Sequence, residues 1–215
     1  PKRTASRHVD IQRALDIFIA AVVCGFLGSR LLHVFWEEPS YYFEEPSRVF
    51  DIMSGGFVWY GGFLGALVGV FLFLRFKKPK SLKNEFLKWA DFFAPVAAFG
   101  YAGGRLACVL TGCCFGRVCE WPHSHTFFRF PSQGFAVLWE LAAGFLLLRY
   151  EKRRNLRTGT IFFAWLALHG LGRIAMELLR ADNRGPSVGP FTISLTVSAA
   201  LLVLGLSFLR HKSKA

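Results

Sequence analysis

The stretch ALDIFIAAVVCGFLGSRLLHVFW, residues 14–36, decides the fold class. It exceeds the roughly 20 mainly apolar residues that a helix needs to cross a hydrocarbon core about 30 Å thick. It is also too long for the core of a signal peptide, and it contains no obvious cleavage site. We therefore predict a membrane-spanning helix over these residues.

Further apolar stretches of this kind follow along the whole chain. They predict helices over residues 52–74, 89–110, 133–148, 158–179 and 190–209. The 215 residues are 53% hydrophobic, which excludes disordered, collagen-like and disulfide-scaffold proteins. The predicted fold is an all-α, polytopic membrane helix bundle of about six transmembrane helices, with residues 1–215 forming a single membrane-embedded domain.

The charge distribution predicts the orientation of these helices. Residues 1–13, 75–88, 149–157 and 210–215 hold 18 of the 26 basic residues, whereas the intervening connectors 37–51, 111–131 and 180–189 hold 5 basic and 7 acidic residues. Because Lys and Arg are retained on the cytoplasmic side, both termini are predicted to be cytoplasmic. The net charge of +12 is then explained by anchoring to anionic membrane lipid, and no nucleic acid partner is expected.

Three arginines, Arg30, Arg105 and Arg173, remain inside the predicted helices. An Arg at the bilayer centre costs roughly 2.5–3.5 kcal/mol even on the mildest scale, so such residues usually mark a site. Each lies about six residues before the outer end of its helix, where a phosphodiester headgroup is the available anion. The alternative is that each Arg reaches the interface or pairs with Glu140 or Glu177.

Two local patterns add candidate site residues. His169, Arg173 and Glu177 are spaced by four, with Arg180 one residue off, so all four can face one cavity. Gly61, Gly65 and Gly69 are also spaced by four and predict close helix packing in lipid. The pairs Gly55-Gly56 and Gly61-Gly62 bracket Trp59 and Tyr60, where the backbone bends or approaches another group.

At five places in the chain, in order, the sequence resembles the prolipoprotein diacylglyceryl transferase family. The matching segments are Gly28-Ser29-Arg30-Leu31, Ser54 to Gly62, Gly104-Arg105 to Gly116-Arg117, Pro131-Ser132-Gln133 and the Gly-x-x-Arg-x-x-x-Glu-x-x-Arg run of Gly170 to Arg180. The resemblance implies an inner-membrane enzyme that moves diacylglyceryl from phosphatidylglycerol to the lipobox cysteine of a prolipoprotein.

The resemblance also implies roles for individual residues. Arg105 and Arg173 would hold the phosphate of phosphatidylglycerol, and Glu177 and Arg180 would order the site. Tyr60 stands where the usual members carry a catalytic histidine, and Cys108 and Cys113 replace the usual Asn and Glu. Further substrate contacts are expected from Arg30, Gly61, Gly62 and Arg117. The family's usual first helix is missing before Pro1.

The residues suit this chemistry without the family name. Displacing a phosphate ester from a glycerol carbon needs a thiolate nucleophile and cations that hold the departing phosphate. Arg105 and Arg173 can supply the cations, and either Tyr60 or His169 can take the thiol proton. Tyr60 can instead be an aromatic interface residue, and His169 can make a hydrogen bond that packs two helices.

Four clustered cysteines, Cys108, Cys113, Cys114 and Cys119, leave several interpretations open. A disulfide is the leading one in an oxidising compartment. A zinc site that adds His123 and His125 has suitable ligands, but adjacent cysteines depart from the usual spacing. A covalent thiol intermediate on Cys113 or Cys114 is a third interpretation.

The sequence therefore predicts a multi-pass enzyme of the bacterial inner membrane, with no cofactor and no metal. Its partners would be phosphatidylglycerol and a prolipoprotein signal peptide with a lipobox cysteine. The alternatives are a membrane thiol–disulfide oxidoreductase that uses the cysteines and a phospholipid-binding or transport protein without catalysis.

Overall fold

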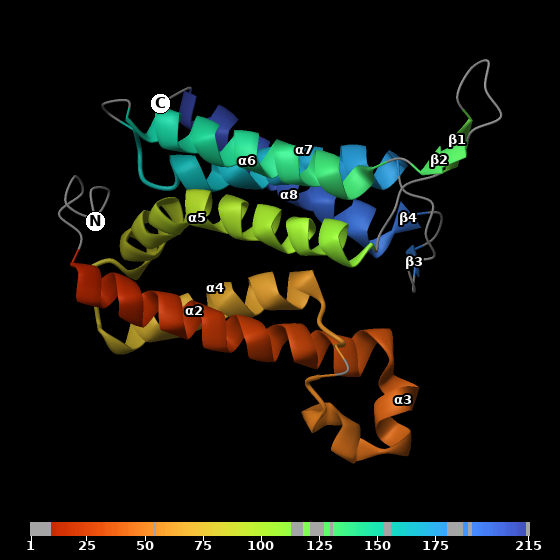
Figure 1. Cartoon of the computed structure of the whole chain (residues 1–215). Coiled ribbons are helices and arrows are strands. Elements are labelled where there is room, and N and C mark those ends of the chain that lie inside the picture. Colours follow the sequence, from red (N-terminus) through yellow and green to blue (C-terminus); the bar gives the residue numbers. More distant parts are fainter. Residues whose placement is uncertain are drawn as a thin grey trace. The chain divides into compact units, whose positions relative to one another are not determined.

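The computed structural model describes residues 10–53, 55–112, 118–120, 127–129, 131–152, 156–179, 187–188 and 191–213. These residues are mainly helical, which confirms the predicted all-α architecture (Figure 1). The helices fall into two compact units, Pro1–Phe86 and Leu87–Ala215. The single domain expected for the whole chain stays a prediction.

Two long helices dominate the first unit. Its elements are α2 (Ile11–Leu32), a π-helical turn η1 (His33–Glu37), α3 (Pro39–Glu44), a 3-10 helix η2 (Pro46–Phe50) and α4 (Trp59–Phe76). The carboxylate of Asp10 accepts a 3.0 Å hydrogen bond from the backbone N–H of Gln12 and thereby caps the start of α2. The helical path continues through η1 to Glu37, one residue beyond the predicted end.

Glycines let α2 and α4 approach each other closely. A Cβ added to Gly28 would lie 2.5 Å from the carbonyl oxygen of Gly61, and one added to Gly69 would lie 2.6 Å from the Cβ of Cys24. Both distances are shorter than real side chains tolerate, so the two backbones meet only because these positions lack side chains. This confirms the packing role predicted for the glycines of residues 61–69.

The predicted start of the second helix was wrong. Helix α4 begins at Trp59, seven residues after the expected start at Ile52. Gly55 and Gly56 have φ values of +87° and +78°, a left-handed conformation that interrupts a right-handed helix. The segment before α4 is therefore a connector.

In the described part of the second unit there are four long helices and two short hairpins. Its elements are α5 (Leu82–Thr111, whose first turn belongs to the first unit), β1 (Val118–Glu120), β2 (Phe127–Arg129), α6 (Ser132–Glu151), α7 (Thr160–Leu179), β3 (Ser187–Val188), β4 (Phe191–Thr192) and α8 (Ile193–Ser213). Strands β1 and β2 pair antiparallel, as do β3 and β4. The sequence analysis did not predict these hairpins.

Helix α7 is fixed by contacts from three sides. Asp91 on α5 accepts hydrogen bonds from the backbone N–H groups of Gly159, at 2.7 Å, and Phe162, at 2.8 Å, and so caps the start of α7. The indole of Trp139 on α6 donates a 2.9 Å hydrogen bond to the carbonyl of Leu168. On α8, the backbone around Ser198 packs directly against Gly170.

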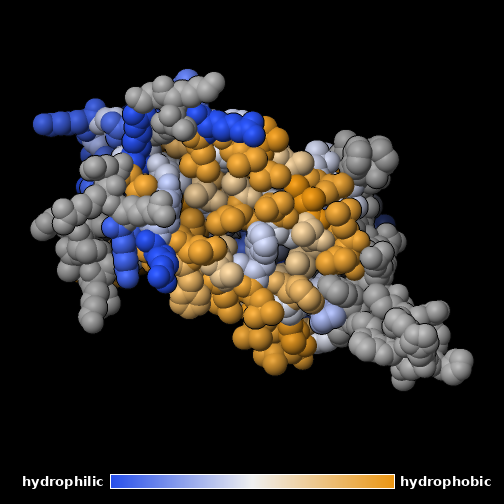
Figure 2. Space-filling view, turned by 90° about the horizontal axis from the view of Figure 1, so that it is seen from above, coloured by the Kyte–Doolittle hydropathy of each residue, from blue (hydrophilic) through white to orange (hydrophobic). Residues whose placement is uncertain are grey.

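Among the described residues, five helices are long and apolar enough to cross a membrane: Ile11–Glu37, Trp59–Phe76, Leu82–Thr111, Thr160–Leu179 and Ile193–His211. They correspond to five of the six predicted spans, and the sixth, residues 133–148, forms α6 but is not among these candidates. Figure 2 shows mainly hydrophobic side chains along the helices and hydrophilic side chains gathered at one end. Such exposed apolar surface suits contact with lipid tails and confirms a polytopic membrane protein.

Candidate active site

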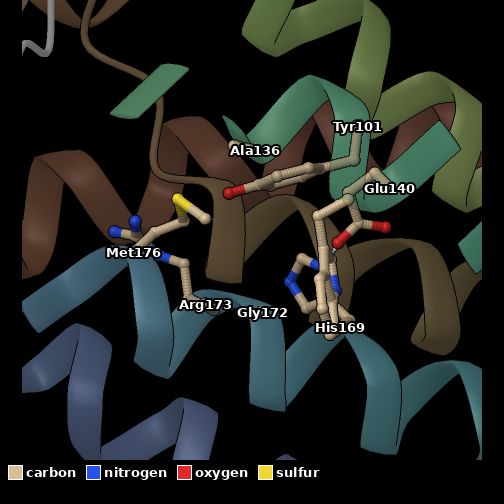
Figure 3. Close-up of a pocket in the computed structure, with 8 residues that line it drawn as sticks. Tyr101, Ala136, Glu140, His169, Gly172, Arg173 and Met176 are labelled. Carbon is tan, nitrogen blue, oxygen red and sulfur yellow. Dashed lines mark hydrogen bonds and ion pairs between the residues drawn. The ribbon is translucent and has the colours of Figure 1, made fainter. Parts of the chain in front are cut away.

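A small cavity in the second unit gathers the ionisable side chains of three helices. It has a volume of about 10 Å³, which is room for a single water molecule. Its lining comes from α5, α6 and α7: Tyr101, Ala136, Trp139, Glu140, His169, Gly172, Arg173 and Met176. In Figure 3, the side chains of Tyr101, Glu140 and His169 lie together on one side of the cavity, and those of Arg173 and Met176 on the other. The second unit thus holds a polar site within an apolar helix bundle.

Arg173 is held by a carboxylate one turn along α7. Its Nη2 lies 3.3 Å from Oε2 of Glu177, and both side chains are largely buried. Oε1 of Glu177 accepts a 2.5 Å hydrogen bond from the hydroxyl of Thr192, and that hydroxyl in turn accepts one from the backbone N–H of Leu195 at the start of α8. Glu177 therefore links Arg173 to the next helix, as the pairing alternative predicted.

Arg105 is oriented by a tyrosine of its own helix. The phenol oxygen of Tyr101 accepts hydrogen bonds from Nε and Nη2 of Arg105, at 3.0 and 2.9 Å. Tyr101 also lines the cavity, as Arg173 does, so Arg105 is connected to the cavity through the side chain of Tyr101. Both arginines implied to bind phosphate thus belong to the same unit and connect to the same cavity.

His169 forms a buried pair with a carboxylate of α6. Its Nδ1 lies 2.6 Å from Oε1 of Glu140, and the two side chains are only 1% and 3% exposed. The ring of Tyr101 stands edge-on to the imidazole, with 4.7 Å between the ring centroids. Glu140 therefore pairs with His169, and Glu177 is the carboxylate that pairs with an arginine.

The spacing of four along α7 brings two of its four predicted side chains to the cavity. His169 and Arg173 line it, and Glu177 contacts Arg173. The fourth, Arg180, lies outside the described residues, as do Arg117, Cys113, Cys114, His123 and His125. Cys108 lies on α5 and is half-buried, and Cys119 belongs to β1. The roles expected for these residues stay predictions.

In the first unit, Arg30 holds a connector. Its guanidinium donates hydrogen bonds to five backbone carbonyls, those of Arg48, Val49, Asp51, Gly55 and Gly56, at 2.5–3.2 Å. The side chain also lies over the rings of Tyr42 and Phe57. A guanidinium has five N–H groups, so these carbonyls occupy all of its donors. Phosphate binding by Arg30 stays a prediction, and the sequence analysis did not foresee these carbonyl partners.

Tyr60, Gly61 and Gly62 form the first turn of α4 in the same unit. Tyr60 is half-buried and stands edge-on to Trp59, with 5.2 Å between the ring centroids. Gly61 is buried against Gly28 of α2, which gives it a role in packing. Contacts of these three residues with a substrate stay predictions.

Sequence reasoning missed Tyr101, Trp139 and Thr192. The separation of four between Tyr101 and Arg105 is a local pattern that could have identified the first. Trp139 and Thr192 act across helices, so no spacing along the chain identifies them. Among the described residues, no group of three or more His, Cys, Asp or Glu side chains could hold a metal ion.

Comparison with known proteins identifies the family to which this chain is similar. The profile described as prolipoprotein diacylglyceryl transferase matches residues 2–210. A phosphatidylglycerol–prolipoprotein diacylglyceryl transferase of Geobacter sulfurreducens is 31% identical over 201 residues, which cover 89% of this chain and 75% of the relative. One of Clostridium perfringens is 30% identical over 217 residues, covering 95% and 81%, and one of Clostridium tetani is 26% identical over 220 residues, covering 95% and 83%. The chain therefore belongs to the prolipoprotein diacylglyceryl transferase family.

Proposed function

We propose that this membrane enzyme transfers the diacylglyceryl group of phosphatidylglycerol to the lipobox cysteine of a prolipoprotein signal peptide, at the outer leaflet of the bacterial inner membrane. The observation that supports the proposal is that Arg173 lines the cavity of the second unit and that Arg105 is hydrogen-bonded to Tyr101, which lines the same cavity. Two half-buried guanidiniums in the same unit suit an anionic headgroup, because arginine forks match phosphate oxygens in pairs.

Arg173 is held on one side by an ion pair. Glu177 takes one side of its guanidinium, and Thr192 holds Glu177 in place. The remaining N–H groups of Arg173 stay available to a phosphate, whose negative charge grows as the ester bond breaks. Stabilisation of developing charge by a preorganised donor is worth about 2.7–4 kcal/mol in enzymes.

Arg105 carries the second phosphate contact. Tyr101 uses two of its N–H groups and fixes the plane of the guanidinium. A guanidinium whose plane is fixed in this way suits recognition of a planar pair of phosphate oxygens. Tyr101 is accordingly a positioning residue for Arg105.

The other predicted residues complete the proposal. Tyr60 at the start of α4 donates its hydroxyl to the phosphate or the glycerol, and Gly61 and Gly62 permit close approach there. Arg30 shapes the connector before α4, and Arg117 and Arg180 add cationic contacts from the outer connectors. The cysteines at positions 108, 113, 114 and 119 are accessory.

The reaction joins sulfur to carbon. The acceptor thiol loses its proton, the thiolate attacks the glycerol carbon that carries the phosphate, and a C–S bond forms as the C–O bond breaks. The electron pair leaves on the phosphate oxygen, and glycerol phosphate departs. Arg105 and Arg173 stabilise that anion, so their removal affects the chemical step.

Mass spectrometry of a lipobox peptide tests the proposal. The purified protein is incubated with the peptide in vesicles that contain phosphatidylglycerol, and in vesicles that contain only phosphatidylethanolamine. We expect diacylglyceryl to be added to the peptide only in the first, with release of glycerol phosphate. Arg105→Ala and Arg173→Ala should each cut the rate by about 10²–10³-fold while the protein remains folded.

A variant with all the outer cysteines replaced by Ser separates transfer from thiol–disulfide exchange. We expect the variant to transfer diacylglyceryl, because the acceptor supplies the thiol. Absence of lipidated peptide in every vesicle, or full activity of either folded arginine variant, would contradict the proposal.

A further inference from the structure

His169 and Glu140 form a pair that the proposed phosphate binding by Arg105 and Arg173 does not use. The two groups lie on different helices, α7 and α6, and their Nδ1 and Oε1 atoms are 2.6 Å apart. Both line the cavity that also contains Arg173 (Figure 3). An ionisable pair inside a membrane helix bundle is expensive, so its presence beside the phosphate cations calls for a function.

Burial of this pair is not explained by stability. Removing two ionisable groups from water costs several kcal/mol each, and their attraction offsets this only when the remaining polar atoms are also satisfied. Oε2 of Glu140 is buried and has no hydrogen-bond partner among the described residues. The pair is therefore retained in spite of this cost, which is typical of a working site.

A His–carboxylate pair has a definite chemical use. When Nδ1–H donates to a carboxylate, the tautomer is fixed and Nε2 becomes the proton acceptor. The same carboxylate then stabilises the imidazolium that forms when a proton arrives, which is the role of the third member of a catalytic triad. The geometry of His169 and Glu140 fits this arrangement.

Charged neighbours explain why a carboxylate is needed. The groups around His169 are Tyr101 and, through its hydroxyl, Arg105 on α5, Glu140 on α6 and Arg173 on α7 itself. From α8, the uncharged backbone around Ser198 packs at the adjacent Gly170. Two cations near the cavity oppose a third positive charge on the imidazole, and Glu140 is the anion that offsets them.

We infer that His169 is the general base of the transfer and that Glu140 is its positioning residue. This inference rests on the proposed function. The acceptor S–H gives its proton to Nε2 of His169, and the thiolate forms the C–S bond. After the C–O bond breaks, the imidazolium returns the proton to the glycerol phosphate that leaves. No oxidant or metal enters this balance.

The test compares two acceptors across a range of pH. His169→Gln and Glu140→Gln are assayed with the lipobox cysteine peptide from pH 6.5 to 9, and with a peptide that carries selenocysteine, whose selenol is ionised at neutral pH. At pH 7 we expect kcat with the thiol to fall about 10²–10⁴-fold, with KM for phosphatidylglycerol little changed. The deficit should shrink as pH rises toward the thiol pKa of about 8.5, and it should nearly vanish with selenocysteine.

Two further variants make the result specific. Asp91→Asn changes another buried carboxylate of the second unit, one that caps α7, so its deficit should be the same at every pH and with both peptides. The double variant of His169 and Glu140 should lose no more activity than His169→Gln alone, because the two residues act as a unit. If Glu140→Gln fails to fold, His169→Gln carries the pH and selenocysteine comparison by itself.

The outcomes separate this inference from the proposed function. If the wild-type protein lipidates no peptide, the proposed function is contradicted. An active wild type with a folded His169→Gln variant whose deficit is absent, or is equal at every pH and with both acceptors, overturns the inference and leaves the function intact. A Tyr60→Phe variant that alone shows the shrinking deficit and the selenocysteine rescue also overturns it, because the base is then Tyr60.

Discussion

Replacing Arg30 by Gln should destabilise the connector between α2 and α4. The change removes a buried cation, 7% exposed, whose donors satisfy five backbone carbonyls. Hydrogen bonds to a charged group contribute roughly 1.5–3 kcal/mol each, but five bonds from one guanidinium are not additive. We therefore expect a loss of about 3–5 kcal/mol, the usual cost of removing one partner from a buried charged cluster.

Thermal unfolding and hydrogen exchange measure this loss. For a chain of this length, 1 kcal/mol corresponds to about 2–4 °C, so the melting temperature should fall by at least about 6 °C. Exchange should rise most at the backbone amides of the connector before α4, including that of Val58, which donates to the carbonyl of Ser29 at 3.2 Å.

Arg48 provides the matched control. Its ion pair with Glu45, at 2.9 Å, joins side chains that are 33% and 56% exposed, so Arg48→Gln should cost less than about 1 kcal/mol. If Arg30→Gln leaves stability and exchange unchanged and instead weakens only the binding of phosphatidylglycerol, then Arg30 is a phosphate ligand and the connector role is wrong.

The remaining predictions concern α7 and the orientation of the chain. Gly172→Ala should lower the free energy of unfolding by about 1–3 kcal/mol, because the new Cβ would overlap the Trp139 indole. Gly100→Ala is the control and should not lower it, because the space around Gly100 is open. Urea or thermal unfolding measures both variants. Asp91→Asn should cost about 1–3 kcal/mol and increase hydrogen exchange in the first turn of α7, because one of two capping bonds is lost. In a background without other cysteines, Ser47→Cys should react with a membrane-impermeant label from outside and Ser81→Cys only after permeabilisation; the reverse pattern would invert the predicted topology.

The helices could be predicted from sequence because the membrane imposes a simple rule. About 20 apolar residues make a span wherever they occur, and flanking charge orients it. The error at the start of α4 has a local cause, since Ile52 and Met53 continue the apolar pattern while Gly55 and Gly56 interrupt the backbone. A hydropathy profile carries no information on backbone conformation, so it does not reveal that two consecutive glycines have positive φ angles.

The sequence predicts those parts of the site whose residues lie on one helix, and it does not predict the contacts between residues of two helices. His169, Arg173 and Glu177 share a face of α7 because they are four residues apart, which is a property of every helix. The partner of His169 is 29 residues away on α6, and either Glu140 or Glu177 had the right chemistry to pair with an arginine. The packing of α6 against α7 is what brings Glu140 to His169, whereas Arg173 and Glu177 already meet along α7.

Three buried carboxylates on neighbouring helices show where this protein tolerates an energetic cost. Both oxygens of Asp91 accept backbone N–H groups of α7, and those of Glu177 meet Thr192 and Arg173. Glu140 meets His169 with one oxygen, and its other oxygen is buried with no hydrogen-bond partner in the described part of the chain. A buried carboxylate costs least when its lone pairs accept hydrogen bonds or face a cation, as they do at Asp91 and beside Arg173 at Glu177. Among the described residues, the second oxygen of Glu140 has no arginine beside it, and Glu140 lines the cavity, which is why we place the proton transfer beside this carboxylate.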